Sequence, residues 1–368
     1  MYDETLDSNL VILDKITSRY FTVFDSYKYT GLYKYIVDTP SDFKERFFQY
    51  NKELKANGFI AFTDQLPDGR IEITIRGYPL IHSTPSKKPM ILFLVTLVFI
   101  AIDAYFRSYN PILSEIIPNY DPLLTAIIYG IGLIAIIGIH ELGHLVMIRK
   151  YGVDASLPYF IPGIPVFALP TFGAVISQRE PPNDRDALFD IGLAGPIAGL
   201  IPTLLITLYS IPTTPVLSPD EFNFIVEKFN VEFTPMITPW LYIKILSFFK
   251  VIGPNDIIIL PPLAFVALLG FLITGLNLLP AWQLDGGHLA RAFFGEETQR
   301  IITFVAIASL FLMGFIFFAL IILMFYFLSG GRSVRPLNDV SPLSMSRKIL
   351  YFVSLILGIL MLPLPLPV

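Results

Sequence analysis

A short segment near the middle of the chain, His140-Glu141-Leu142-Gly143-His144, combines the residue types and the spacing of a zinc site. On a helix, residues four positions apart lie on one face, so the two imidazoles can bind a single ion. Glu141 lies beside the first histidine, where its carboxylate can accept a proton from a water molecule that the zinc activates. The segment therefore predicts metal-assisted hydrolysis, with His140 and His144 as zinc ligands and Glu141 as the general base.

A catalytic zinc site usually has a third protein ligand, and the sequence offers two candidates for it. Cysteine is absent, so the ligand must be an Asp, Glu or His from another part of the chain. Asp285 is the best candidate because it closely follows a long apolar run, and His288 is its rival. Asn277 is a polar residue at the end of that run. We expect it either to bind an extended peptide or to bond to a backbone carbonyl that Pro280 frees.

The predicted site is embedded in an apolar sequence. The chain has 368 residues, of which 54% are hydrophobic and 15% are charged, and its mean hydropathy is +0.64. These values are typical of a membrane protein. Ionisable residues inside an apolar span are costly, which favours a functional role for His140, Glu141 and His144 over a buried polar cluster that only joins helices. The formal net charge of −4 gives no reason to expect nucleic-acid binding.

Six apolar segments are candidates for crossing a bilayer, which takes about 20 residues of helix. They are 90–106, 123–147, 187–209, 257–279, 301–328 and 350–362. The shorter segment 236–249 contains Pro239, and we expect it to be interfacial or re-entrant. The second and fourth spans then run in the same direction, so His140, His144 and Asp285 meet at a similar depth. The N-terminus is acidic and polar, which predicts that the first span is an uncleaved membrane anchor.

The segment 151–185 is rich in Pro, Gly and aromatic residues, and it is mostly uncharged before Arg179. Its prolines exclude a regular helix. Non-helical backbone at membrane depth must be buried in protein or line a water-filled cavity. We therefore predict a re-entrant loop over 155–178, with a strand at 171–177 that lines a cavity. An ordinary surface loop is the alternative.

Residues 1–88 carry the charge content of a soluble protein and predict a small α+β domain. Helices are expected at 4–17 and from a cap at Ser41 through about residue 57. Strands are expected at 58–63 and 70–76, joined by a turn at 66–69, and a further strand is expected within 27–37. The fold class is thus a polytopic α-helical membrane protein with about six transmembrane helices and a small N-terminal α+β domain. That domain is interpreted as a cap without chemistry or as a substrate filter or partner-binding domain.

These motifs resemble the site-2 protease family of intramembrane zinc metalloproteases, peptidase family M50. The matching pieces are HELGH at 140–144, the pattern N-x-x-P-x-x-x-x-D-G over 277–286, and AGPIAG at 194–199, which is similar to the family's Gly-Pro signature. The spacing Gly195-x-x-x-Gly199 also predicts close helix packing. The resemblance covers about residues 90–330, the core of an expected metalloprotease domain at 89–368. It implies one zinc ion held by the two histidines and Asp285, with Glu141 as the base.

The resemblance also implies an active site below the cytosolic membrane surface and a substrate span that unwinds before cleavage. Unwinding is physically required, because a membrane helix hides each peptide bond in its own hydrogen bonds. We expect the substrate to add as a strand to 171–177, where Phe172 and Gly173 lie. The soluble N-terminal part, and a connection at 210–256 too short for a folded domain, match the branch with an N-terminal extension and no PDZ domain.

The predicted function is zinc-dependent hydrolysis of peptide bonds within or near transmembrane segments of substrate proteins. The expected partners are such membrane proteins and the lipid bilayer, and the expected location is the cell membrane, with several spans and the active site near the cytosolic side. Charge counting alone does not decide the orientation, and the sequence predicts no oligomeric state. The alternative is a metal-ion transporter or a metal-dependent membrane receptor, neither of which needs Glu141. A third reading is an inactive relative, which the intact ligand set disfavours.

Overall fold

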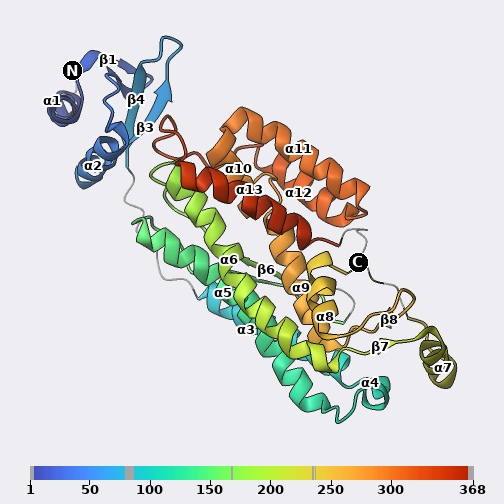
Figure 1. Cartoon of the computed structure of the whole chain (residues 1–368). Helices are drawn as coiled ribbons and strands as arrows, with labels where there is room; N and C mark the ends of the chain where they lie inside the picture. Colours follow the sequence, from blue (N-terminus) through green and yellow to red (C-terminus); the bar gives the residue numbers. More distant parts are fainter. Residues whose placement is uncertain (1–3, 79–86, 167–168, 234–235, 237, 364–368) are drawn as a thin grey trace.

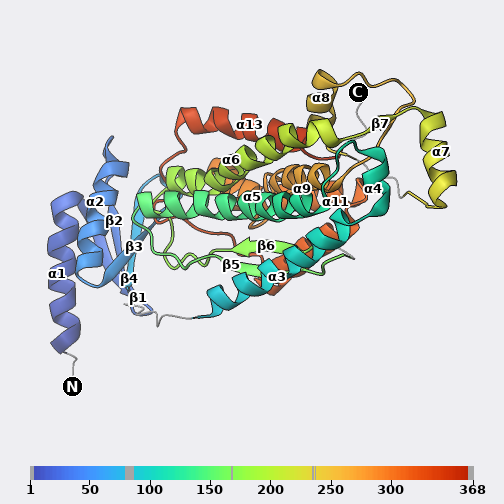
Figure 2. The same cartoon turned by 90° about the horizontal axis from the view of Figure 1, so that it is seen from below.

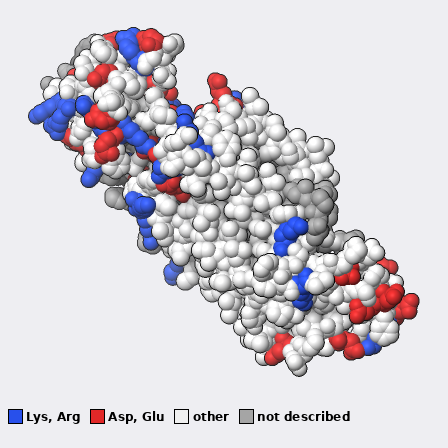
Figure 3. Space-filling view, viewed as in Figure 1, with Lys and Arg blue, Asp and Glu red and all other residues white. Residues whose placement is uncertain are grey.

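The computed structural model describes residues 4–78, 87–166, 169–233, 236 and 238–363. A sheet-containing N-terminal region lies at one end of a bundle of helices (Figure 1, blue). Most charged side chains on the face shown in Figure 3 gather at the two ends of the molecule, and the surface between them is largely uncharged. This distribution is that of a helical bundle within a membrane with a polar region at each end.

The N-terminal region is an antiparallel four-stranded sheet, in the order β1-β2-β4-β3, packed against two helices. Its elements are α1 Glu4–Tyr20, β1 Val23–Tyr29, β2 Leu32–Val37, α2 Phe43–Ala56, β3 Phe59–Gln65 and β4 Ile71–Gly77. The predicted hairpin of β3 and β4 is confirmed. The further strand expected within 27–37 is confirmed as β2. An additional strand, β1, precedes it, because Thr30 and Gly31 adopt positive φ angles and turn the chain into a hairpin of β1 and β2. The cap expected at Ser41 is also wrong, since α2 is preceded by Asp42.

Three helices of the described residues are long and apolar enough to cross a membrane, and they match the first three predicted spans. They are α3 Lys88–Ser108, α5 Pro122–Lys150 and α6 Arg185–Ser210, which a short 3-10 helix, η1 Ile211–Thr213, continues. The fourth predicted span is the shorter helix α9 Pro262–Asn277. These helices pack against one another, with α6 in contact with both α5 and α9.

The fifth predicted span is wrong as a single helix. Residues 301–328 belong to two helices, α11 Glu296–Leu312 and α12 Ile316–Leu328, which contact each other. Gly314 lies between them with φ +84°, a left-handed conformation that ends the helix and that glycine adopts without steric cost. The sixth candidate corresponds to α13 Met345–Leu360, which begins before the apolar run.

The remaining elements connect these helices. They are α4 Pro111–Ile116, β5 Tyr159–Pro162, β6 Thr171–Val175, β7 Val216–Leu217, α7 Pro219–Phe229, α8 Trp240–Phe249, β8 Ile257–Ile258 and α10 Asp285–Phe294. Helix α8 has ten residues and is about 15 Å long. That is about half the thickness of a bilayer's hydrocarbon core, in agreement with the interfacial or re-entrant segment expected there.

The Pro- and Gly-rich segment after α5 forms a two-stranded hairpin of β5 and β6, which lies between α3 and α5 (Figure 2). The predicted strand is thus confirmed over 171–175. Ala174 of β6 packs against an apolar cluster to which α3, α5 and α9 all contribute, including Ile136 and Ile137 just before His140. Asp103, fully buried in α3, accepts a hydrogen bond of 2.7 Å from the backbone N–H of Val166. The first apolar helix therefore holds the connection between the two strands.

Candidate metal centre

The three predicted ligands converge where α5, α6 and α10 meet. The carboxylate oxygens of Asp285 lie 3.2 Å from His140 Nε2 and 3.3 Å from His144 Nε2, and the two Nε2 atoms are 3.2 Å apart. A tetrahedral zinc ion with ligand bonds of about 2.0–2.1 Å separates its ligand atoms by about 3.3 Å. The three atoms therefore form a triangle of the size of one face of a zinc coordination tetrahedron.

Hydrogen bonding prepares the triangle for a cation. His144 Nδ1 lies 2.7 Å from the carbonyl oxygen of Ile191, to which it donates, so its Nε2 presents a lone pair to Asp285. Asp285 Oδ2 and His140 Nδ1 are buried without a hydrogen-bond partner among the described residues. Lone pairs that face one another at these distances repel unless a positive charge lies between them. Imidazole and carboxylate without sulfur form a ligand set that suits zinc, so the residues fit the ion.

Helix α5 places both histidines and Glu141 by its regular geometry. The helix begins with Pro122 after Asp121, whose carboxylate accepts hydrogen bonds from two backbone N–H groups of the first turn. His140 and Glu141 are buried, with 4% and 7% of their surface exposed. One helical turn later, His144 points to the same side as His140. The catalytic base proposed from the sequence therefore lies inside the bundle, where bulk water is largely excluded.

Glycines on α6 make room for the two imidazoles. A Cβ atom added to Gly195 would lie 2.1 Å from His144 Nε2, and one added to Gly199 would lie 3.0 Å from His140 Cβ. On the facing helix, a Cβ at Gly143 would lie 2.5 Å from the carbonyl oxygen of Ala194. The close packing predicted from the spacing of Gly195 and Gly199 is confirmed, and its role is to let α6 lie directly over the ligands.

A tight turn between α9 and α10 carries Asp285 back toward α5. Gly286 and Gly287 permit this turn, because a Cβ at either position would lie 2.2 Å from a backbone oxygen, that of Leu278 or Trp282 respectively. The carboxyl ends of α5 and α9 thereby meet, as expected for two spans that run in the same direction. The topological argument for Asp285 thus agrees with the geometry.

The structure separates the other candidate residues. Asn277 reaches the centre, with its Nδ2 atom 3.4 Å from His140 Nε2. His288 is not part of the triangle, and its Cβ atom faces Gly192 on α6 instead. Phe172 is 45% exposed on β6, and Gly173 beside it has φ +93°. No residue pattern points to the carbonyl of Ile191 that orients His144, because a backbone group leaves no trace in residue type.

Two imidazoles and a carboxylate, held at zinc-ligand distances by apolar helices, define a membrane-embedded centre of the HExxH type. The chain belongs to peptidase family M50, whose sequence profile matches residues 128–330, more than half of the chain. The match includes most of α5 and all of α6, α9, α10, α11 and α12, and therefore all three candidate ligands and Glu141. The family resemblance drawn from the motifs is confirmed.

Among known proteins, the chain is similar to zinc metalloproteases of Arabidopsis thaliana. It is 29% identical over 175 residues to "probable zinc metalloprotease EGY2, chloroplastic", and this aligned region covers 48% of this chain and 30% of the relative. It is 30% identical over 235 residues to "probable zinc metalloprotease EGY1, chloroplastic", and this aligned region covers 63% of this chain and 41% of the relative. The chain thus matches less than half of the length of these curated relatives. No solved structure matches it significantly.

Proposed function

We propose that this protein is a zinc-dependent endopeptidase that hydrolyses peptide bonds within or near the transmembrane segments of other proteins. The observation that carries the proposal is the triangle of His140, His144 and Asp285 beside Glu141, within the apolar helices of a family M50 chain. One zinc ion per chain, held by these three side chains, supplies a Lewis acid and makes a water molecule nucleophilic near neutral pH.

The remaining chemistry belongs to side chains of the protein. Glu141 accepts the proton of the attacking water and passes it to the leaving amine. The hydrogen bond from His144 to the carbonyl of Ile191 keeps that imidazole in one tautomer and orientation. Asn277 is assigned to the substrate, because its amide can donate to and accept from an extended backbone next to the centre.

The substrate enters in an extended form and adds to β6. A helical span offers no free peptide group, since each N–H and C=O is bonded within the helix. Among the described strands, β6 pairs only with β5 and so keeps one edge that can accept a further strand. Phe172, exposed on β6, and Gly173, with its open backbone, are the residues that we assign to contact the substrate there.

We further propose a division into an N-terminal soluble domain at 1–88 and a transmembrane metalloprotease domain at 89–368, with its core at about 90–330. The proposed location is the cell membrane, with about six membrane crossings and the metal centre near the cytosolic side. Arg149 and Lys150 end α5 just beyond the centre, which supports a cytosolic position for that end of the helix. The proposed partners are substrate proteins with a transmembrane segment and the bilayer.

Quantitative proteomics in the native host tests this function. Membrane-protein fragments are compared between cells that carry the wild type and cells that carry Glu141→Gln, and the wild type alone should produce a set of fragments cut near transmembrane segments. Elemental analysis of the purified protein should find about one zinc per chain, lost in the double variant His140→Ala/His144→Ala. Identical fragment sets, or full zinc retention in the double variant, contradict the proposal.

A further inference from the structure

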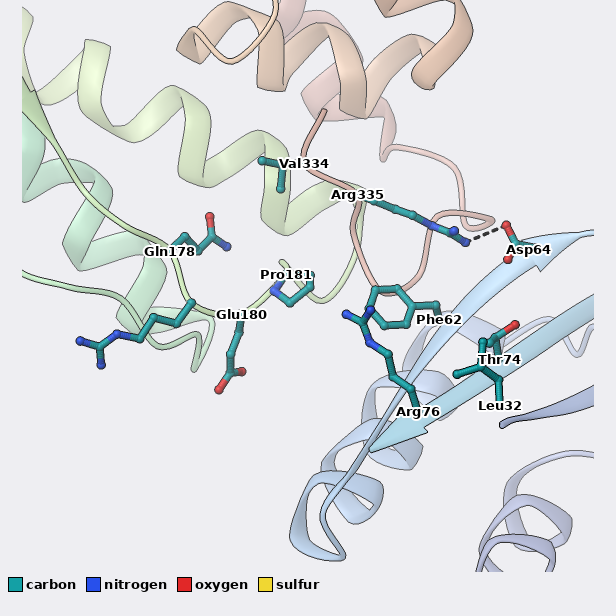
Figure 4. A pocket seen from close by; sticks show the side chains of 11 residues that line it. Leu32, Phe62, Asp64, Thr74, Arg76, Gln178, Glu180, Pro181, Val334 and Arg335 are labelled. Atoms are coloured by element: carbon teal, nitrogen blue, oxygen red, sulfur yellow. Dashed lines mark hydrogen bonds and ion pairs between the residues drawn. The ribbon is translucent and has the colours of Figure 1, made fainter. Parts of the chain in front are cut away.

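The N-terminal sheet is joined to the helical bundle by a segment that follows α12. Strand β3 lies at the edge of the sheet, and its Thr63 N–H donates a 3.0 Å hydrogen bond to the carbonyl of Leu337. Leu337 is fully buried in the apolar core of the N-terminal region. Arg335 donates to the Thr63 carbonyl and to the carboxylate of Asp64, both at 2.7 Å, beside a cleft of about 580 Å³ (Figure 4). The segment 335–339 thus covers an otherwise open sheet edge.

The same segment carries Asp339, which lies between Thr63 and α10. The backbone N–H of Asp339 donates a 3.0 Å hydrogen bond to Thr63 Oγ1. Its two carboxylate oxygens accept hydrogen bonds of 3.1 Å and 2.6 Å from the guanidinium of Arg291 on α10. Arg185, at the start of α6, donates to the same carboxylate at 3.0 Å. Asp339 therefore connects the N-terminal sheet with two helices of the metal centre. One is α6, which packs on the histidines of α5, and the other is α10, which carries Asp285.

Arg291 is a charged residue in an unusual place. It is 1% exposed, and its Nε atom donates to Ser333 Oγ at 3.2 Å. A buried charge is costly unless it is paired, and the double hydrogen bond to Asp339 fixes the plane of the guanidinium as well as its position. An apolar residue would fill the same space without that directional constraint. The pairing thus defines the position of α10 more strictly than apolar packing alone.

Asp285 is the first residue of the ten-residue helix that Arg291 anchors. The two residues are separated by about 9 Å along the helix axis, at 1.5 Å per residue. At the other end of the helix, Gly286 and Gly287 pack against backbone oxygens without room for a methyl group. Because a helix of this length moves as a rigid element, a shift at Arg291 also displaces the carboxylate of Asp285.

We propose that Arg291 and Asp339 are positioning residues for the metal centre, and that the N-terminal region, through Thr63, is part of the structure that holds Asp285 in place. The inference rests on the proposed function because it takes Asp285 as a zinc ligand. It assigns the N-terminal region a role in assembling the site, in addition to any contact with substrates.

A second set of contacts between the N-terminal region and the bundle provides a matched control. Lys55 on α2 forms a 2.6 Å ion pair with Glu180, in the loop before α6, and that pair does not involve α10. Removing it with Lys55→Gln weakens the attachment of the N-terminal region. The proposal predicts that this variant leaves the metal centre unchanged. If the centre instead depended on the attachment of the N-terminal region in general, Lys55→Gln would weaken zinc binding as much as Asp339→Asn.

The test measures zinc affinity of the purified full-length protein by competition with a chelator, together with thermal unfolding of the zinc-free protein. Asp339→Asn and Arg291→Lys should each weaken zinc binding about 10-fold, the lower end of the effect of groups that orient metal ligands. The double variant Asp339→Asn/Arg291→Lys should bind zinc as tightly as the more strongly affected single variant, because the two residues act as one unit. Lys55→Gln should bind zinc like the wild type. If Asp339→Asn does not fold, Thr63→Val removes only the hydroxyl that Asp339 contacts and should show a smaller loss in the same direction.

The inference is overturned if both Asp339→Asn and Arg291→Lys bind zinc like the wild type, or if Lys55→Gln weakens binding equally. Asp285→Ala, measured alongside, separates this result from a failure of the proposed function. Normal zinc affinity in Asp285→Ala contradicts the proposed ligand set itself. Loss of zinc in Asp285→Ala with no effect of Asp339→Asn contradicts only the positioning role.

Discussion

Adding one methyl group at Gly195 tests how strictly α6 shapes the metal centre. In Gly195→Ala the new Cβ would lie 2.1 Å from His144 Nε2 and 2.5 Å from two carbons of the same ring. Ordinary van der Waals contact begins at 3.4 Å, so the imidazole or the helix must move by about 1.3 Å. Zinc sites hold their ligand distances to within about 0.2 Å. The substitution is therefore expected to remove His144 from the ligand set.

The variant should still fold, but its zinc affinity should fall by at least about 100-fold. That loss exceeds the contribution of groups that only orient a metal ligand. Chelator competition measures the affinity, and thermal unfolding of the zinc-free protein measures the fold. Gly138→Ala on α5 is the matched control, because its Cβ would meet nothing within 4 Å. That variant should keep its zinc and gain up to about 1 kcal/mol of stability, as alanine favours helix over glycine. Equal zinc affinity in the two variants would refute the close-packing argument.

Two further predictions concern the third ligand and the N-terminal sheet. Asp285→Ala should lose zinc while His288→Ala retains most of it, and the reverse result in elemental analysis would mean that the wrong residue was chosen. Burial alone raises the pKa of Glu72, but hydrogen bonds from the Lys34 ammonium and the Tyr27 hydroxyl outweigh burial and hold that pKa below its ordinary value. Because the folded pKa is lowered, the stabilisation is present above about pH 4.3, the ordinary pKa of Glu, and is lost as the pH falls through the folded pKa. Thermal unfolding of wild type and Glu72→Gln should therefore differ at neutral pH and converge in acid, and a constant difference would contradict this assignment.

The convergence of the three candidate ligands could be predicted from the sequence because two local rules and one topological rule were sufficient. The spacing of His140 and His144 places both on one helix face, and the absence of cysteine restricts the third ligand. Co-directional spans then bring Asp285 to the same depth, which the distances to both histidines bear out. Each rule depends on residues within one element or on the order of the elements.

Other features depend on contacts that no local pattern encodes. The composition of the apolar run 301–328 does not distinguish one long helix from two short ones. The break lies at Gly314, whose left-handed backbone conformation cannot continue a helix. The pairing of Arg291 with Asp339 joins positions 48 residues apart. The capture of the β3 edge at Thr63 by Leu337 joins positions 274 residues apart. Such contacts arise from tertiary packing and were not foreseen from the sequence.

The most direct test of the proposed protease is a comparison of wild type and Glu141→Gln in vitro. Both proteins are incubated in detergent with a panel of single-span membrane proteins, at equal zinc content, and fragments are identified by mass spectrometry. Glutamine keeps the size of the side chain but cannot take a proton from water, so the variant should keep its zinc and bind substrate spans. It should lose cleavage by at least about 10²–10⁴-fold, the contribution of general-base catalysis. A transporter would yield no fragments with either protein, and equal fragment yields from the two would remove Glu141 from the mechanism.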